Sequence, residues 1–171
     1  MAHRFEELIE HHHDEIFAYL WRLFRSDGRR DGAMEVEDLA QEVFMRAYRS
    51  FGRLRPDSNH RAWLYKIATN CAYTRLKQMK HRLDRLSSLQ EAATEPGAAS
   101  DTSIARKDME QRVRALVNTL PAKQKACVTL RYLQELDYPE IAQILGCSQD
   151  SARANVYQAI RRLRLSLEES I

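Results

Sequence analysis

The sequence predicts an all-α protein made of two small helical domains joined by a flexible linker. Apolar residues recur at the three- and four-residue spacing of amphipathic helices along most of the chain. Glycine (5) and proline (4) are few among 171 residues, and β-branched residues are not clustered into runs typical of strands. Residues 87–103 break this pattern, because they lack Lys and Arg and are rich in Ala, Ser, Thr, Pro and Gly. We therefore expect an N-terminal module over residues 1–86 and a C-terminal module over residues 104–171.

The N-terminal module begins with an amphipathic helix that ends before the turn-rich residues 26–32. Within it, residues 11–15 (HHHDE) are of types that bind metals. Consecutive helical residues point in different directions, so three adjacent histidines cannot converge on one ion. We interpret this run as a solvated polar face and expect neither a metal nor any other cofactor.

A second helix is expected from about residue 36 to 51, with Val36, Leu39, Val43, Ala47 and Phe51 as its buried row. Asp38 and Glu42 then lie on the outside, four residues apart, with no basic residue between them. This acidic patch is either a docking point for another protein or a complement to the helix dipole. The sequence at this position leaves both readings open.

A proline-containing loop, residues 53–61, leads into a third helix from about residue 61 to 86, which should bury Leu64, Ile67, Ala68 and Cys71. Its outer face should carry Lys66, Thr69, Asn70, Tyr73 and Lys77. Residues 58–83 contain Lys and Arg but no acidic residue. Aromatic residues, Trp63 and Tyr65, open this basic helix, and such a mixture suits nucleic acid, although burial is the favoured reading for Trp63 alone.

The C-terminal module begins with a helix through Met109, Val113, Leu116, Val117 and Leu120 that stops at Pro121. A further helix, about residues 123–134, should pack Cys127, Leu130 and Leu133 beneath the final elements. Residues 138–167 then read as a helix-turn-helix, because Gly146 suits a left-handed C-terminal cap and Ser148 can cap the next helix.

The exposed face of the last helix decides its chemistry. Its buried row is Ala152, Val156, Ala159, Leu163 and Leu167, and residues 151–167 hold arginines but no acidic residue. Small and amide side chains early on the outer face can approach base edges, and later arginines suit phosphates. A solvated basic hairpin is the plainer alternative. We favour duplex DNA as the ligand of Ser151, Arg153, Ala154, Tyr157, Gln158, Arg161 and Arg162.

The net charge of +3 is uninformative alone, but acids concentrate in residues 1–45, which suits a basic protein partner there. No run is long enough to span a membrane and no secretory signal is evident, which predicts a cytoplasmic protein. The three cysteines, Cys71, Cys127 and Cys147, are expected to be reduced and mostly buried. The chain contains no HExxH motif, paired carboxylates or glycine-rich phosphate loop, so we do not expect an enzyme.

Four segments in order resemble the extracytoplasmic-function group of bacterial sigma factors, in the sigma-70 family: DLAQEVFMRAYRSF (38–51), AWLYKIATN (62–70), residues 120–148 and the arginine-rich final helix. The resemblance implies that the first of these helices docks on the β′ subunit of RNA polymerase through Asp38, Gln41, Glu42 and Phe44. It also implies that the loop and helix around Trp63 recognise and melt the −10 promoter element. Together with the basic, aromatic face of that helix, this assigns to the −10 element Ser58, Asn59, His60, Arg61, Trp63, Lys66, Asn70 and Tyr73.

By the same resemblance, the helix-turn-helix reads the −35 element in the major groove, and the linker threads through the polymerase channel. Many family members carry basic residues where this chain has Asn155, Gln158 and Ile160, so its affinity for the −35 element should rest more on Arg153, Arg161 and Arg162. We therefore expect a sigma factor that binds core polymerase (β′ and β) and promoter DNA and is held by an anti-sigma factor. The alternative is a stand-alone helix-turn-helix regulator that binds duplex DNA without polymerase.

Overall fold

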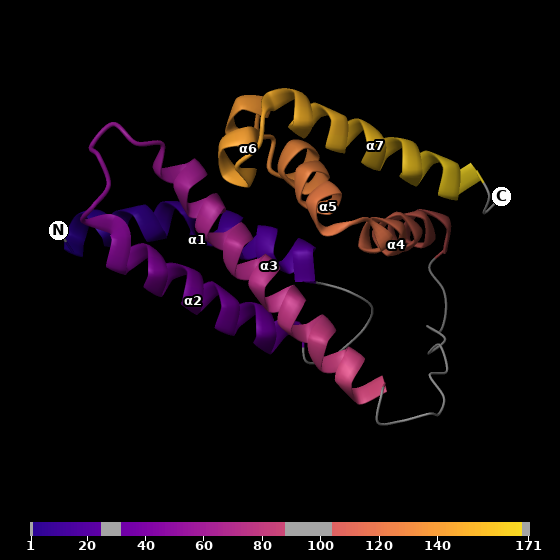
Figure 1. The fold of residues 1–171 in the computed structure, drawn as a ribbon, viewed down its shortest axis with the longest axis horizontal. Coiled ribbons are helices and arrows are strands. Elements are labelled where there is room, and N and C mark those ends of the chain that lie inside the picture. The colour runs from indigo at the N-terminus through magenta and orange to yellow at the C-terminus, as the bar shows by residue number, and fades with distance from the viewer. Residues whose placement is uncertain (1, 25–31, 88–103, 169–171) are drawn as a thin grey trace.

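The computed structural model describes residues 2–24, 32–87 and 104–168, and every regular element among them is a helix (Figure 1). The N-terminal helices are α1 (Ala2–Phe24), α2 (Gly32–Phe51) and α3 (His60–Ser87). They are followed by α4 (Ile104–Thr119), α5 (Ala122–Val128), the π-helical turn η1 (Thr129–Leu133), α6 (Tyr138–Leu145) and α7 (Gln149–Glu168). The predicted all-α class is confirmed. The predicted linker, apart from Ser87 at the end of α3, lies outside the described residues. None of the described helices is long and apolar enough to cross a membrane.

Helices α1, α2 and α3 pack against one another and bury the apolar rows that the helical period predicts. On α2, Val36, Leu39, Val43 and Ala47 are all buried, and Phe51 is half-buried. The helix starts at Gly32, earlier than the predicted residue 36. Because this buried row of α2 faces the bundle, the opposite face of the helix points away from it.

The helix-turn-helix is confirmed and is held by its caps. The Asp137 carboxylate accepts the Glu140 backbone N–H at 2.8 Å, and the Glu140 carboxylate accepts the Asp137 N–H at 3.2 Å, which makes a capping box at the start of α6. Gly146 ends α6 with φ of 62° in the left-handed region. The Ser148 hydroxyl then accepts the Ser151 N–H at 3.1 Å and begins α7, which packs on α5 and α6.

The two modules share one hydrophobic core. Helix α6 lies beside the beginning of α3, as Figure 1 shows, and η1 contacts α1. Tyr65 of α3, Leu130 of η1 and Ile141 of α6 are fully buried members of the same cluster. The sequence predicted two modules but not that they would pack together.

Two sequence predictions about burial are wrong, those for Thr69 and Leu133. Thr69 is 1% exposed rather than on the outer face of α3, because its hydroxyl bonds the Tyr19 hydroxyl (2.9 Å) and donates to the Tyr65 carbonyl (2.7 Å). The sequence left open whether Tyr65 belongs to the core or stacks on bases; the residue is fully buried, so it belongs to the core. Leu133 is 51% exposed, and the neighbouring Gln134 is buried in its place, where its side chain accepts a hydrogen bond from Tyr65.

Candidate nucleic-acid interface

The outer face of α7 presents the side chains that the sequence predicted. Ala154, Tyr157, Gln158 and Arg161 are all exposed, with Tyr157 at 70%. Gln158 accepts a hydrogen bond from Gln124 of α5 at 3.1 Å, which restricts its rotamer. Because acidic residues are missing between residues 151 and 167, this face is suited to the edges and phosphates of duplex DNA.

Arg153 lies at the start of the same face, over a tyrosine ring. Its guanidinium carbon is 5.2 Å from the ring centre of Tyr138, the first residue of α6, and that of Arg131 is 4.8 Å from the same ring. Such cation–π contacts hold a guanidinium in place without using its hydrogen-bond donors. Arg153 is therefore positioned with its donors available.

The loop between α2 and α3 borders a hollow of about 310 Å³. The residues that line it are Arg4, Phe51, Gly52, Leu54, Arg55, Pro56 and His60. The rings of Phe51 and His60, with centres 6.0 Å apart, form part of its wall, and the ring of Trp63 lies behind them, 6.4 Å from that of Phe51. Flat rings beside guanidinium groups suit a planar base and its phosphate.

The residues of this loop that were predicted to contact the −10 element have different surroundings. Asn59 caps α3, because its side-chain oxygen accepts the Ala62 N–H at 2.9 Å. Ser58 closes a turn onto the Arg55 carbonyl (3.1 Å), and His60 lines the hollow. Trp63 is half-buried against Phe51, which agrees with the favoured reading of burial better than with a fully exposed stacking ring.

Helix α3, whose first residue His60 lines the hollow, carries an exposed row. Lys66, Asn70 and Lys77 are exposed and recur at helical spacing, while Tyr73 between them is half-buried. Tyr73 points its hydroxyl toward the Ala122 carbonyl of α5, at 3.5 Å, rather than into solvent. Acidic residues are missing from residues 58–83, so the row has one sign of charge.

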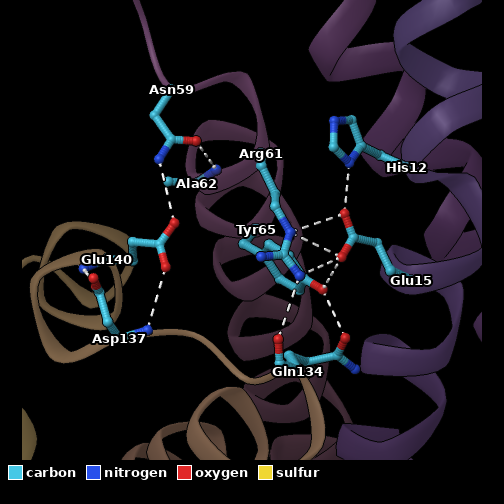
Figure 2. Close-up of polar contacts among 9 residues, drawn as sticks. All are labelled: His12, Glu15, Asn59, Arg61, Ala62, Tyr65, Gln134, Asp137 and Glu140. Carbon is cyan, nitrogen blue, oxygen red and sulfur yellow. Dashed lines mark hydrogen bonds and ion pairs between the residues drawn. The ribbon is translucent and has the colours of Figure 1, made fainter.

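Arg61 is the most constrained of the side chains predicted to contact the −10 element. Its guanidinium donates to the Glu15 carboxylate of α1 at 2.7 and 3.0 Å and to the Gln134 carbonyl at 3.3 Å, as Figure 2 shows. Its hydrogen bonds to Glu15 raise the pKa of Arg61. Burial acts to raise the pKa of Glu15, but the hydrogen bonds from Arg61, His12 and Tyr65 outweigh it and hold that pKa below its ordinary value. In this arrangement Arg61 serves a carboxylate, not a phosphate.

The predicted polymerase-binding residues lie on three sides of α2. Asp38 and Gln41 are exposed on its outer face. Glu42, on one flank, pairs with Arg46 of α2 and with Arg75 of α3 at 3.4 Å. Phe44, on the other flank, is half-buried under the ring of His13, with ring centres 5.5 Å apart. Asp38 and Gln41 are therefore more accessible to a partner than Glu42 and Phe44.

The histidine run of α1 makes local contacts. His12 hydrogen-bonds Glu15, and His13 hydrogen-bonds Asp14 at 3.0 Å while stacking on Phe44. Within the described ranges, there is no group of three His, Cys, Asp or Glu side chains that could hold a metal ion.

Comparison with known proteins decides the family. The family model for Sigma-70 region 2 matches residues 8–82, and that for Sigma-70, region 4 matches residues 110–163. The chain is 30% identical over 133 residues to the ECF RNA polymerase sigma-E factor of Escherichia coli, which covers 73% of this chain and 70% of that relative. The chain belongs to the ECF group of the sigma-70 family.

Other relatives and structures agree. The sigma factor is 29% identical over 144 residues to the RNA polymerase sigma-H factor of Pseudomonas aeruginosa, covering 80% of this chain and 75% of the relative. It is 24% identical over 175 residues to the ECF sigma factor SigW of Bacillus subtilis, covering 96% of this chain and 89% of the relative. Its fold is similar to that of the sigma factor RpoE in complex with the anti-sigma factor NepR from Bartonella quintana (TM-score 0.73, 22% identity, 96% and 97% covered). It is also similar to CnrH in complex with the cytosolic domain of CnrY (TM-score 0.68, 18% identity, 100% and 92% covered).

The extent of the matches argues against the alternative of a stand-alone regulator. The helix-turn-helix falls in region 4, but region 2 accounts for most of the N-terminal module, including α2, most of the residues that line the hollow, and most of α3. A protein that only bound duplex DNA through α7 would not need a second region of this family. The chain is an RNA polymerase sigma factor.

The sequence reading missed two features of the sigma factor. Met34, Met45 and Tyr48 are 72%, 55% and 61% exposed and continue the outer face of α2 on either side of Asp38 and Gln41. Their spacing of 34, 38, 41, 45 and 48 is one helical stripe, so the helical period could have identified it. Arg4 and Arg55 at the hollow could not have been paired from the sequence, because they lie on separate elements.

Proposed function

We propose that this sigma factor divides promoter recognition between two faces, one on each module. The hollow and the outer row of α3, in residues 1–86, take the −10 element, and the outer face of α7, in residues 104–171, reads the −35 element. The observation that carries this assignment is that α3, which bears the acid-free exposed row of Lys66, Asn70 and Lys77, starts at His60, and His60 lines a hollow walled by rings and guanidinium groups.

In this proposal the hollow holds a base that has left the stack. Unstacking costs a few kcal/mol per step and must be offset by contacts made only to the flipped base. Phe51 and His60 offer ring faces, and Arg4 and Arg55 offer charge for the adjoining phosphates. Promoter melting then requires no chemistry from the protein, so the sigma factor is not an enzyme and needs no cofactor.

The outer stripe of α2 is the proposed docking face for core polymerase, on its β′ subunit. Asp38 and Gln41 supply polar contacts, and Met34, Met45 and Tyr48 surround them with exposed apolar surface. An apolar patch with an acidic centre fits a partner surface that is basic and partly apolar. The similar structure of RpoE is a complex with the anti-sigma factor NepR, and we propose an anti-sigma partner for this chain as well. We place the action of the sigma factor itself in the cytoplasm, where polymerase and promoters are found.

Run-off transcription with bacterial core polymerase on a library of promoter fragments tests this function. Adding the protein should start transcription on a subset of fragments that share two spaced motifs. Transcripts that begin without the protein, or motifs that carry only one element, would contradict the division into two reading faces. If core polymerase gains nothing while the protein alone shifts duplex DNA, the proposed docking face on α2 is wrong.

A further inference from the structure

Gln158, on the exposed outer face of α7, is held by a residue of another helix. Helix α5 lies beside α7 (Figure 1), and Gln124 of α5 is only 6% exposed. The Gln124 side-chain Nε2 donates to the Gln158 Oε1 at 3.1 Å. Because Gln124 is too deeply buried to meet DNA itself, any influence that it has on recognition acts through Gln158.

The direction of this hydrogen bond decides which atom of Gln158 is turned outward. The oxygen and the nitrogen of a glutamine amide branch from one carbon in different directions. Since the oxygen of Gln158 is turned toward the buried Gln124, the nitrogen is turned away from it. This nitrogen carries two N–H donors and no acceptor. Gln158 is exposed, so it offers donors to whatever α7 binds.

The opposite orientation of the Gln124 amide is disfavoured. In the observed orientation, the Gln124 Oε1 is buried without a hydrogen-bond partner among the described residues. If the amide turned over, this oxygen could accept from Gln158, but the NH2 group of Gln124 would then be buried without an acceptor. Buried N–H groups that lack a partner are rarer in folded proteins than carbonyl oxygens that lack one. Gln124 therefore acts as the donor.

The unpaired oxygen also makes the hydrogen bond costly to break. Gln158 is the one partner that the Gln124 amide has in the part of the chain that the structure describes. If Gln158 turned its oxygen toward a base, the whole polar end of Gln124 would be buried without a hydrogen bond. Burying an unpaired polar group destabilises the folded protein. A base therefore meets Gln158 with its oxygen already engaged.

We propose that Gln124 is a positioning residue for the −35 element: by engaging the oxygen of Gln158, it makes this glutamine a donor that prefers guanine to adenine. A free glutamine suits adenine in the major groove, where it donates to N7 and accepts from N6. Guanine presents two acceptors instead, N7 and O6, which suit the donors of Gln158. The preference rests on the proposed function, because it requires α7 to read the −35 element, whereas the hydrogen bond between the glutamines does not.

Competition binding of polymerase holoenzyme to promoters with every single-base-pair change in the −35 element tests the preference. The base pair read by Gln158 is the one whose preference disappears in Gln158→Ala, and there the wild type should bind guanine more tightly than adenine. Gln124→Met keeps the length of the side chain but removes both polar atoms, and it should lower the ratio of these affinities about five-fold. Gln111→Met, the same change at an exposed position of α4, should leave the ratio unchanged.

A double variant separates positioning from a general effect on folding. If Gln124 acts through Gln158, Gln124→Met should alter no base preference once Gln158 is alanine. A changed preference in that background would overturn the proposal, as would a wild type that prefers adenine. A Gln158→Ala variant that keeps every base preference, or a Gln124→Met variant with the wild-type ratio, would overturn it equally. Gln124→Leu takes the place of Gln124→Met if the latter fails to fold.

Nuclear magnetic resonance of the free full-length chain tests the hydrogen bond by itself. The side-chain NH2 of Gln124 should exchange with water more slowly than that of Gln158, and Gln158→Ala should raise its exchange rate about five-fold. An unchanged exchange rate would overturn the inference and leave the proposed function standing. The expected protection together with a holoenzyme that ignores the −35 element would overturn the proposed function, and the guanine preference with it.

Discussion

At the residue scale, the position of Arg153 depends on a neighbour in another helix. The ring of Tyr138 lies 5.2 Å from the guanidinium carbon and holds the group in place without using its hydrogen-bond donors. Free arginine side chains lose much rotamer freedom on binding, and a supported one loses less. Of the arginines on α7, this is the one best prepared to read a base edge instead of a phosphate.

Replacing Arg153 with Ala should therefore change which sequences of the −35 element are preferred, by about 1–3 kcal/mol at the affected base pair. The measurement is competition binding of polymerase holoenzyme to promoters that differ at a single base pair of this element. Arg164→Ala, an exposed arginine near the end of α7, is the matched control and should weaken all sequences alike or none. If Arg153→Ala instead weakened binding to all sequences equally, Arg153 would contact a phosphate and not a base edge.

The thiols differ in their surroundings and should differ in reactivity. Burial raises the pKa of Cys127 to about 12 and also raises the pKa of Cys71, whereas Cys147 is half-buried. Because the thiolate is the reactive species, we expect one rapidly reacting thiol per folded chain at neutral pH and three in urea. Titration with a chromogenic disulfide reagent, with Cys147→Ser as the reference, measures this. Rapid reaction of the Cys147→Ser variant would contradict the burial of the other two.

At the scale of elements, the turn between α6 and α7 depends on one backbone conformation. Gly146 has φ of +62°, and a Cβ placed there would meet no described atom within 4 Å. Gly146→Ala should consequently lower the free energy of unfolding through backbone strain alone, by about 1 kcal/mol. Urea unfolding measures the change, with Gln143→Ala on the same helix as control. If Gly146→Ala lowered the free energy of unfolding no more than Gln143→Ala does, the backbone of the turn would have relaxed to accommodate the Cβ.

The outer stripe of α2 gives the second prediction at this scale. Asp38→Arg should reduce affinity for core polymerase roughly ten-fold, since it replaces attraction by repulsion at a basic partner surface. Glu168→Arg at the end of α7 makes the same change in net charge and should have little effect. Fluorescence anisotropy of labelled sigma factor with core polymerase gives both affinities. Equal affinities would remove Asp38 from the docking face.

Most of the helices could be predicted from the sequence because each carries its own apolar row, and the helices of the helix-turn-helix also carry local caps. Gly146 and Ser148 are local signals, and both were read correctly. The misplaced residues are those whose surroundings come from distant parts of the chain. Thr69 is buried because its hydroxyl meets Tyr19, fifty residues earlier, and Gln134 replaces Leu133 inside because Tyr65 bonds to it. A helical period contains no information about such partners.

The same limit applies to the candidate site. The exposed faces of α2 and α7 follow from helical spacing, so Asp38, Gln41 and Tyr157 were placed correctly outside. The hollow could not be predicted, since Arg4 is brought to Arg55 only by folding. The ion pair of Arg61 could not be predicted either, because its carboxylate partner lies in α1.

At the scale of the whole molecule, the packing of the two modules should depend on pH through Glu15. Its pKa lies below the ordinary value of 4.5 in the folded protein, so its ionised form favours folding above that value. That contribution is lost as the pH falls through the lower folded pKa. Unfolding by urea should show a steeper loss of stability below about pH 4.5 in the wild type than in Glu15→Gln. Glu10→Gln, exposed on the same helix, should retain the wild-type slope.

The π-helical turn η1 sets the rotational phase of the residues that come after it. Its defining hydrogen bond, from the Gln134 N–H to the Thr129 carbonyl at 3.1 Å, spans five residues instead of four. Geometrically, η1 is therefore a helix with one residue inserted, and removing that residue would turn the next side chains by about 100° about the axis. Gln134 would leave Tyr65, while the capping box that starts α6 depends only on Asp137 and Glu140. Deleting a single residue of η1 should thus separate the modules while leaving each of them folded. At this turn, the number of residues, rather than their chemical identity, determines whether the two modules pack together.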